Sequence, residues 1–438
     1  MIGESGGVVL RDRTLTGWEH MKFHSTIFGG WFAILILACT CSAQVQTATK
    51  PRPVKVRSIT AFITIDRAQY RQQMQDALRM LNSAKSMFEK AGYEVQTLRL
   101  TTQPFPQYTR GISKIEALNF FKGLDEFGQQ QNVMVNIGPA MLANSDDPAE
   151  AELLGEILSS TGLFASLMVA GDDGIHWNAV HEAAKVIKYI ESHSPDGKNN
   201  FDFAATAVMP PYAPFYPGSY HTGEGHQFSI ALEGGNFVTD VFAASAGDIQ
   251  IAQKRLAEQL NEQARAIEAV AHTVEQQSGW AYMGIDPTPA PNGDSSIGAA
   301  FEKLNGAKFG SSGTLSVAAA ITAAVRGVEA KHAGYSGLML PPLEDAVLAQ
   351  RWAEGAYNVD SLLSYSAVCG TGLDTVPLPG DVSEEQLAKM IADVASLAFK
   401  WRKPLTARLI PVPGKKAGED TGHFGPPGMP ATTLQSVP

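Results

Sequence analysis

The sequence predicts one large α/β domain, and three observations support this prediction. From Val54 onward, apolar runs rich in β-branched residues alternate with helical periods. The chain has 438 residues, of which 44% are hydrophobic and 18% charged, a composition typical of globular proteins. No linker or change of composition interrupts residues 54–416. We therefore expect a single domain built on one large sheet or barrel.

Nine segments have the apolar pattern of buried strands. In chain order they are residues 56–65, 93–101, 132–138, 164–171, 201–209, 227–234, 281–286, 366–376 and 406–412. Between them, residues 66–91 and 250–277 repeat apolar side chains at helical spacing, as at Met74, Leu78 and Leu81. These stripes predict helices whose apolar faces pack against the core.

The first 43 residues have the pattern of a secretory signal. Lys22 precedes a 13-residue apolar run from Ile27 to Cys39, which is shorter than the roughly 17–25 residues of a membrane span. Cleavage after Ala43 is one alternative and lipid attachment at Cys39 is another, while Met21 is an alternative start. The sequence predicts an exported protein, periplasmic or extracellular, whose only membrane contact is this segment or a lipid anchor.

The rest of the chain divides into a domain over residues 44–420 and a Pro/Gly/Thr-rich tail over residues 421–438, which we expect to be loose. The net charge is -10 and the sequence pI is about 5.5, without a run of basic residues. Nucleic acid is therefore excluded as an expected partner. A small-molecule ligand is expected, and a homo-oligomer is left open.

Three predicted strands end in a Pro-x-Pro loop that is followed by a charged residue. The loops lie within residues 284–294, 372–381 and 409–416. Proline ends a strand, and ligands of α/β sheets usually bind at the carboxyl ends of strands. If the strands run in one direction, the loops present one set of charged residues to a single cavity: Asp294, Asp381, Lys415 and Lys416.

These charged residues also have a structural interpretation. Asp294 precedes a predicted helix, and Ser383 with Gln386 forms a capping box directly after Asp381. Strands of opposite direction would place the three loops on different rims. Helix capping and ligand binding therefore both remain as interpretations.

Asp286 and Asp374 lie at strand ends in apolar surroundings, where an ionised carboxylate needs a partner. A divalent metal, a lysine partner or a raised pKa would satisfy this need, and a buried structural salt bridge is the non-functional alternative. Cys369 lies near Asp374 in the same segment. A free cysteine is usually a small buried hydrophobe, and a Cys/His nucleophile would need a histidine brought close by tertiary structure.

Three further residues are candidates for substrate binding. Ser312 belongs to a Gly/Ser loop that opens an Ala-rich helix, whose free N–H groups bind an anion or are simply capped. His221 precedes a Gly-rich loop that leads into a strand ending at Glu233. Two interpretations remain: either both residues line a pocket, or the loop lies at the surface.

Several blocks closely resemble the uncharacterised family known as domain of unknown function 711. They read TPAPNGDSSIGAAFEKL, FGSSGTLSVAAAIT, GYSGLMLPPLED, YSAVCGTGLDTVPLPGD and KPLTARLIPVPGKKAGED. With weaker blocks upstream, the resemblance covers most of residues 54–420. It implies a fold similar to pyruvate formate-lyase and the anaerobic ribonucleotide reductases, a ten-stranded α/β barrel made of two five-stranded halves.

The same resemblance bears on chemistry. It implies a site inside the barrel, near the loop where glycyl-radical enzymes carry a thiyl-forming cysteine. By this resemblance, Cys369 would occupy the position of that cysteine. The C-terminal radical motif of those enzymes is missing from this sequence. We therefore expect the barrel without glycyl-radical chemistry. The resemblance implies no reaction, because no activity is established for the family.

Together these observations predict an enzyme that acts on a small polar or anionic metabolite through a carboxylate/lysine pocket. The expected catalytic residues are Asp286, Asp374, Cys369, Asp381 and Lys415. The expected substrate-binding residues are Asp294, Ser312, His221, Glu233 and Lys416. A divalent metal is one candidate cofactor. The alternative is a non-catalytic binding or sensing protein, which would have an apolar, fully paired pocket instead of carboxylates that titrate near neutral pH.

The export signal predicts a processed N-terminus. In protein isolated from its native cells, we expect the chain to begin at Gln44, or at a lipid-modified Cys39. Mass spectrometry of the N-terminal peptide distinguishes these two products. An intact chain that begins at Met1 or Met21 would contradict the prediction.

Overall fold

The computed structural model describes residues 50–438 except 369, 423, 425–427 and 438. Residues Thr49–Pro438 belong to one compact unit. The predicted signal segment, with Cys39 and Ala43, lies outside the described residues, and so does Cys369. None of the helices in the described part of the chain combines the length and apolar content that a membrane crossing requires.

Ten strands form one sheet, and each of the nine predicted strands corresponds to one of them. The tenth, β5, is a two-residue strand that pairs only with β4. The strands are β1 (Lys55–Ile63), β2 (Val95–Thr102), β3 (Met134–Pro139), β4 (Phe164–Gly171), β5 (Gly174–Ile175), β6 (Phe203–Ala207), β7 (Gln227–Glu233), β8 (Ala281–Ala290), β9 (Gly372–Pro379) and β10 (Leu405–Val412).

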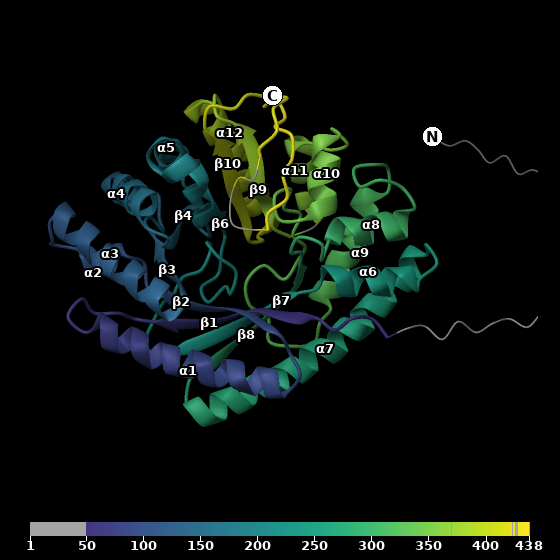
Figure 1. Ribbon diagram of the computed structural model, residues 1–438, viewed down its shortest axis with the longest axis horizontal. Coiled ribbons are helices and arrows are strands. Elements are labelled where there is room, and N and C mark those ends of the chain that lie inside the picture. Colours follow the sequence, from purple (N-terminus) through teal and green to yellow (C-terminus); the bar gives the residue numbers. More distant parts are fainter. Residues whose placement is uncertain (1–49, 369, 423, 425–427, 438) are drawn as a thin grey trace, which may run out of the picture. The chain divides into compact units, whose positions relative to one another are not determined.

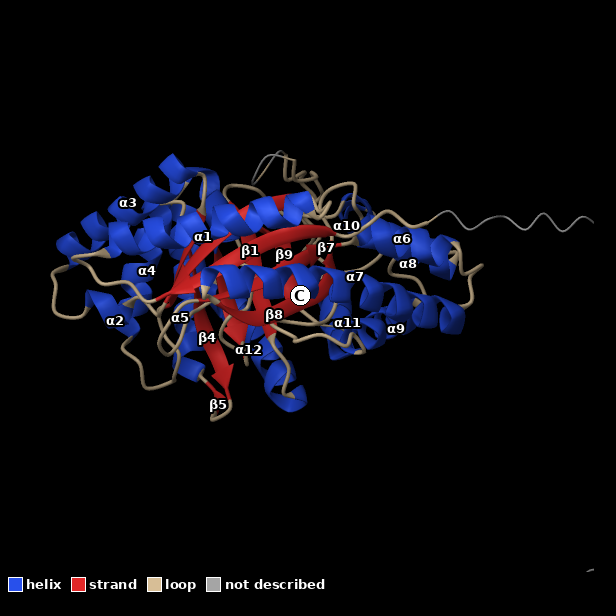
Figure 2. Cartoon of the chain, turned by 90° about the horizontal axis from the view of Figure 1, so that it is seen from below, coloured by secondary structure: helices blue, strands red, loops and turns tan. Residues whose placement is uncertain are grey.

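Helices surround the strands (Figures 1 and 2). They are α1 (Tyr70–Lys90), α2 (Pro106–Thr109), α3 (Lys114–Gln131), α4 (Pro148–Ser160), α5 (Trp177–His193), the 3-10 helix η1 (Pro195–Asp202), α6 (Gly235–Ala243), α7 (Ile249–Ser278), α8 (Ile297–Asn305), α9 (Thr314–Arg326), α10 (Ala346–Ala353), α11 (Val359–Val368) and α12 (Glu384–Trp401). The predicted helices over 66–91 and 250–277 are confirmed as α1 and α7. One strand boundary was wrong, because residues 366–368 end α11, whose buried Leu362 and Ser366 follow helical spacing.

The sheet consists of two sets of parallel strands that run in opposite directions. Strands β1, β2, β3, β4 and β6 are parallel, and β7 and β10 pair antiparallel with β1 and β6 at the two sides of this set. Strand β8 continues parallel to β7, and β9 parallel to β10. The prediction of a single-domain, ten-stranded α/β barrel is confirmed. The two sets hold five and four strands, with β5 paired to β4 alone, in place of two five-stranded halves. The strands that end in Pro-x-Pro, β8, β9 and β10, run in the same direction.

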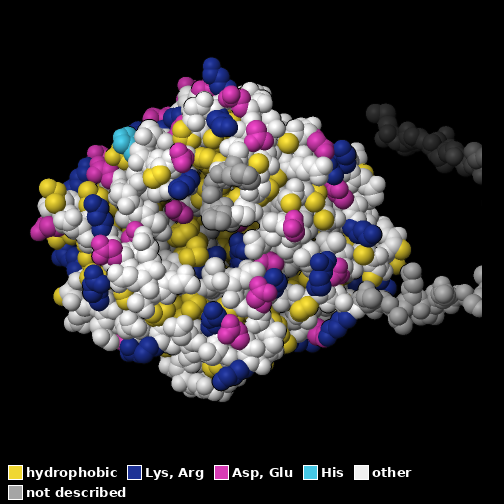
Figure 3. Space-filling model, in the orientation of Figure 1, with side chains coloured by type: hydrophobic (Ala, Val, Ile, Leu, Met, Phe, Trp, Pro, Cys, Tyr) yellow, Lys and Arg dark blue, Asp and Glu magenta, His cyan; other side chains and the backbone are white. Residues whose placement is uncertain are grey.

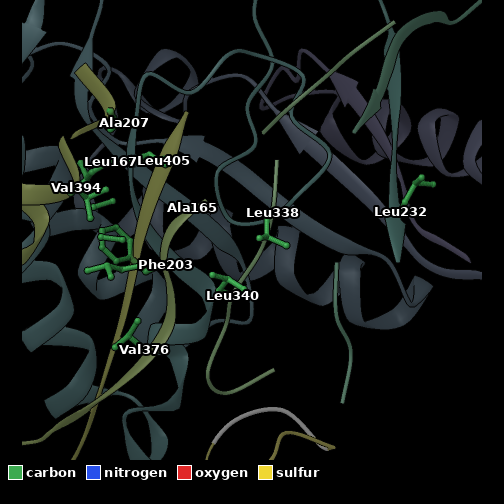
Figure 4. Packing of buried hydrophobic residues seen from close by; sticks show 14 of the residues in the cluster. Ala165, Leu167, Phe203, Ala207, Leu232, Leu338, Leu340, Val376, Val394 and Leu405 are labelled. Atoms are coloured by element: carbon green, nitrogen blue, oxygen red, sulfur yellow. The ribbon is translucent and has the colours of Figure 1, made fainter. Parts of the chain in front are cut away.

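The two faces of the strands differ sharply in polarity. The outward-facing residues form the hydrophobic core with the helices; in Figure 4, Ala165, Leu167, Phe203 and Leu405 lie near Val394 of α12. The alternate, inward-facing residues are largely polar yet buried. They include Ser58, Thr60, Arg99, Thr101, Asn136, Thr206, Ser229, Asp286, Thr288, Asp374, Thr406 and Arg408.

The loop between β6 and β7, residues 208–226, enters the barrel and binds this polar face. The Pro214 carbonyl accepts hydrogen bonds from Ser58 Oγ at 3.1 Å, Thr60 Oγ1 at 3.2 Å and Arg99 Nη1 at 3.0 Å. Asn136 Nδ2 donates to the Pro217 carbonyl at 2.7 Å. Because buried polar groups need partners, the loop backbone satisfies side chains that an apolar filling would leave unpaired.

A second segment, residues 331–344, lies between β8 and β9, the two ends of the sheet. Ile285 of β8 donates to the Lys331 carbonyl at 2.7 Å, and Thr371, just before β9, donates from Oγ1 to the Leu338 carbonyl at 3.1 Å. The backbones of Gly337 and Gly370 approach so closely that a Cβ on Gly337 would lie 2.6 Å from the Gly370 Cα. This closing segment therefore spans the gap between the two edge strands.

Asp286 fastens the closing segment to β8. Its carboxylate accepts hydrogen bonds from the backbone of Tyr335 at 2.7 Å and Ser336 at 3.1 Å, and from the Thr288 hydroxyl at 2.6 Å. Burial raises the pKa of Asp286, and these donors oppose the rise. The side chain is fully buried, and its two oxygens face donors only.

The C-terminal tail differs from the loose segment that the sequence predicted. Leu434 and Thr432 are buried, and Thr432 Oγ1 donates to the Ala349 carbonyl at 2.7 Å. The Phe424 ring lies 6.1 Å from the ring of Phe201. Apolar side chains and backbone pairing with residues 418–421 hold the described part of the tail against the domain, which its Pro/Gly-rich composition did not indicate.

The hydrogen bonds of Asp286 predict a structural role. Asp286→Asn places an amide donor against N–H or O–H donors, and we expect it to lower the free energy of unfolding by about 2–4 kcal/mol. Urea denaturation measures this loss. The matched control is Asp294→Asn, at an exposed aspartate that we expect to change stability by less than about 0.5 kcal/mol. Equal stability of the two variants would contradict the assignment.

Candidate functional site

A cavity of about 220 Å³ remains inside the barrel. It lies between the strands, the closing segment and the loop of residues 208–226, which we call the inward loop. It lies where β1–β4 and β6 begin and where β8 ends. Figure 3 shows a hollow near the centre of one face, where basic and acidic side chains lie close together. We call it the arginine cavity. Its charged lining residues are Arg57, Arg99, Asp202, Glu344, Asp374 and Arg408.

Arg408 of β10 holds the charged cluster together. Its Nη1 lies 3.0 Å from Glu344 Oε1 of the closing segment and 3.0 Å from Asp374 Oδ1 of β9. Its Nη2 donates to the Phe201 carbonyl at 3.0 Å. The guanidinium therefore joins β9, the closing segment and η1, which directly precedes β6, and its planar donors suit this role better than a lysine.

A β-bulge aims Asp374 at Arg408. The pairing of β9 with β10 shifts between Ala407 and Leu409, so that Asp374 and Thr375 together face Arg408. Thr375 has a φ of 44°, which is a costly backbone conformation for a β-branched residue. Burial raises the pKa of Asp374 to about 6; Arg408 opposes this rise and Glu344 adds to it.

A second bulge brings Arg57 of β1 to the cavity. The pairing of β1 with β7 shifts between Val56 and Ser58. Arg57 Nη2 lies 3.7 Å from Glu344 Oε2, and Nη1 lies 4.0 Å from Glu233 Oε2. Glu344 is thus shared by Arg57 and Arg408.

Among the three arginines of the cavity, Arg99 of β2 alone has no ion pair with a described residue. Its Nε donates to Thr97 Oγ1 at 3.2 Å and its Nη1 to the Pro214 carbonyl, while its guanidinium lies 4.9 Å from the ring centre of Tyr216. No carboxylate of the described residues lies within ion-pair distance of Arg99. Burial and the charge of Arg57 lower its pKa to about 9.

Asp202, the last residue of η1, is the remaining acid of the cavity. Burial raises its pKa to about 7, Arg408 opposes the rise, and Asp125 of α3 adds to it. No hydrogen bond to its side chain occurs within the described part of the chain. Asp202 and Asp374 are therefore two carboxyl groups that exchange protons near neutral pH.

Of the predicted catalytic residues that the structure describes, which leave out Cys369, only Asp374 lines the arginine cavity. For Asp374 the sequence left open a divalent metal, a lysine, a raised pKa or a buried salt bridge, and the partner in the structure is Arg408. Asp286 lies behind Tyr335 and binds backbone N–H groups. Lys415 instead donates to the Asp420 carbonyl at 2.7 Å. The prediction of a carboxylate/lysine pocket was therefore wrong about the cation, because an arginine and not a lysine pairs with Asp374.

Asp381 and the predicted substrate-binding residues have other surroundings. Asp294, Asp381, Ser312 and Lys416 are exposed, and Ser383 with Gln386 forms the capping box of α12 that was the structural interpretation at Asp381. The three Pro-x-Pro strands do end at one rim, but these side chains lie outside the cavity because the loops that carry them lead into surface helices and turns.

His221 and Glu233 are buried, and neither lines the cavity; Glu233 lies next to it through Arg57, whereas His221 lies at the opposite end of β1. His221 Nε2 lies 2.8 Å from Gln227 Oε1 and Nδ1 lies 3.2 Å from Thr64 Oγ1. Burial lowers the pKa of His221. Glu233 accepts from Gln96 and pairs with Arg57.

Sequence reasoning missed the three arginines, Glu344 and Asp202. A signal existed for Arg99 and Arg408, because each interrupts an apolar strand pattern at a position where a charge would be buried. Arg57 and Asp374 reach the cavity only through bulges, which the sequence pattern does not reveal. Among the described residues, no group of three or more His, Cys, Asp and Glu side chains is arranged to hold a metal ion.

Comparisons with known proteins agree on one family. Residues 49–424 match the family model described as Uncharacterised ACR (DUF711). A UPF0210 protein of Pyrobaculum arsenaticum is 32% identical over 78% of this chain and 79% of its own length. A UPF0210 protein of Bifidobacterium longum subsp. infantis is 27% identical over 81% of this chain and 82% of its own.

Solved structures give a weaker likeness. The anaerobic ribonucleotide reductase from Thermotoga maritima in complex with dATP and CTP matches with a TM-score of 0.40 and 8% identity, over 81% of this chain and 75% of that one. The family match spans most of the described domain, together with the strands that line the cavity. The chain therefore belongs to the uncharacterised DUF711 family.

Proposed function

We propose that the protein is an enzyme that acts on a small anionic metabolite in the arginine cavity. The observation that carries this proposal is Arg99, a buried guanidinium that lines the cavity without a carboxylate partner among the described residues. A buried cation is costly without an anion. A ligand anion would supply the partner that the protein does not.

Two carboxyl groups favour an enzyme over a non-catalytic binding or sensing protein. Asp374 has a pKa of about 6 and Asp202 a pKa of about 7, and both line the same cavity as Arg99. General acid–base catalysis is most effective when the pKa of the group lies near the working pH. A binding protein would gain nothing from carboxyl groups tuned in this way.

Each charged group has a role in this proposal. Arg99 binds the anionic group of the metabolite, while Arg408 fixes the position of Asp374 through their 3.0 Å ion pair. Asp374 and Asp202 give or take a proton at the reacting atoms. The N-terminal sequence adds the separate proposal that this chemistry occurs outside the cytoplasm.

The first prediction concerns ligand binding by Arg99. Thermal unfolding in the presence of small carboxylates and phosphates should reveal anions that raise the melting temperature, because a ligand of the folded state stabilises it. We expect Arg99→Met to weaken the affinity for such an anion about 10–100-fold, the loss of one or two charge-assisted hydrogen bonds.

Arg79→Met is the matched control, because the Arg79 side chain on α1 is 62% exposed and far from the cavity lining. It should leave anion binding unchanged. Anion binding that survives Arg99→Met would argue against the proposed site. Binding without conversion of any tested metabolite would favour the sensing protein.

The second prediction concerns the pH dependence of stability. The pKa of Asp202 rises on folding from 3.8 to about 7, so the stability that its protonated form contributes is present in full below about pH 4 and is lost as the pH rises through about 7. Asp202→Asn cannot ionise and should escape this loss. Relative to the native protein, we expect the variant to gain about 1–3 kcal/mol between about pH 5 and about pH 8.

Urea denaturation at the two pH values measures this difference. Asp381→Asn, at an exposed aspartate, serves as the control and should show no comparable gain. A pH dependence shared by Asp202→Asn and the native protein would show that Asp202 is ionised throughout.

A further inference from the structure

The lining of the arginine cavity carries no excess of positive charge for a ligand anion. It holds three guanidinium groups, of Arg57, Arg99 and Arg408, and three carboxyl groups, of Asp202, Glu344 and Asp374. With all six ionised, their charges sum to zero, and Glu233, which pairs with Arg57 at 4.0 Å, adds one more carboxyl group just outside the lining. A doubly charged phosphate would therefore add two uncompensated negative charges in a space of low dielectric, whereas a single carboxylate adds one.

The free edge of Arg99 suits one flat anion. Nε and Nη1 already donate to Thr97 and Pro214, and these two hydrogen bonds fix the orientation of the guanidinium, whose Cζ lies 4.9 Å from the ring centre of Tyr216. No acceptor for Nη2 occurs among the described residues. A carboxylate in this plane would accept hydrogen bonds from that edge.

Apart from Thr97, Tyr216 and Tyr335, the rest of the lining is apolar, and it leaves little room. Met134 and Phe164 line the cavity from β3 and β4, Phe215 from the inward loop, Met339 from the closing segment and Met429 from the C-terminal tail. A volume of about 220 Å³ corresponds to about seven water molecules at roughly 30 Å³ each. The body of the ligand must therefore be compact, and an apolar or aromatic group fits this lining.

The extra negative charge can be removed by one proton. Asp374 faces Arg408 of β10 and Glu344 of the closing segment, and Asp202 faces Arg408 and Asp125 of α3. Each acid thus has another carboxyl group nearby, and both share one cation. A bound carboxylate would add to this repulsion and favour protonation of one of the two acids.

We infer that the substrate class of this cavity is a small monocarboxylic acid with a compact apolar or aromatic body, and that it binds together with one proton, held by Asp202 or Asp374. This inference rests on the proposed function and names the class of metabolite. The proton neutralises the pair of charges that the ligand carboxylate would otherwise leave unbalanced. It also places an acidic O–H beside the bound substrate.

Isothermal titration calorimetry with benzoate and isobutyrate tests the inference on the full chain. We expect Arg99-dependent binding that weakens about tenfold per pH unit between about pH 7 and about pH 8.5, with uptake of one proton measured from buffers of different ionisation enthalpy. Inorganic phosphate and the neutral benzyl alcohol should bind at least about tenfold more weakly than benzoate.

Variants of the two acids locate the proton. Asp202→Asn, at a partly exposed residue, should make benzoate binding at about pH 8 tighter and its pH dependence shallower if Asp202 holds the proton; otherwise Asp374→Asn should do so. Circular dichroism checks that each variant is folded. If neither single variant has this effect, the double variant must remove the pH dependence for the inference to stand.

The outcomes separate the two proposals. Arg99-dependent binding in which phosphate exceeds benzoate, or in which benzoate binding does not depend on pH, overturns the monocarboxylate inference and leaves the anionic-metabolite enzyme intact. Failure of benzoate, isobutyrate and phosphate to bind in an Arg99-dependent manner overturns both.

Discussion

The polar inner face of the barrel is the constraint on which the rest of the structure depends. Ser58, Thr60 and Arg99 are buried and cannot reach bulk water. Their donors converge on one backbone carbonyl, that of Pro214 in the inward loop. Unpaired buried donors cost more than hydrogen bonds gain, so the barrel requires a filling of irregular backbone in place of a layer of apolar side chains. The outer face satisfies the ordinary hydrophobic pattern and carries the stability.

This filling explains why a charged cavity exists. The inward loop and the closing segment fill the barrel only in part. They leave a cavity of about 220 Å³ beside charged side chains of the strands. The charged side chains there are largely removed from water, and that of Asp374 is 9% exposed. Desolvation thus raises the pKa of Asp374 and Asp202 while it lowers that of Arg99. Opposite shifts in acids and bases are the signature of burial, and Glu344 and Arg408 only modulate them.

Much of the fold was predictable because the outer face of the barrel is built from apolar side chains at strand and helix spacing, and this periodicity can be read from the sequence. Apolar alternation located all nine long strands, and the capping box at Ser383 marked the start of α12. The site was less predictable. Asp374 was identified through its apolar surroundings, but its partner Arg408 lies in another strand, and only the pairing of β9 with β10 brings them together. Exposed residues such as Asp294 follow strand ends in sequence, yet the chain carries them out of the barrel. The proximity of charged residues in sequence did not predict their convergence in space.

The bulges at Arg57 and Asp374 indicate that the charges are placed for a purpose other than stability. Each bulge interrupts a ladder, and the one in β9 holds Thr375 at a φ of 44°, a conformation that costs about 1–3 kcal/mol. Buried ion pairs seldom stabilise a protein more than apolar residues of similar size. A barrel selected only for stability would have no need of Arg408 between two acids, or of Arg99 without one. Strain at Thr375 and desolvation of Asp374 and Arg99 thus occur at or next to the lining of a single cavity, and the proposed anionic ligand would give the cost of burying Arg99 a purpose.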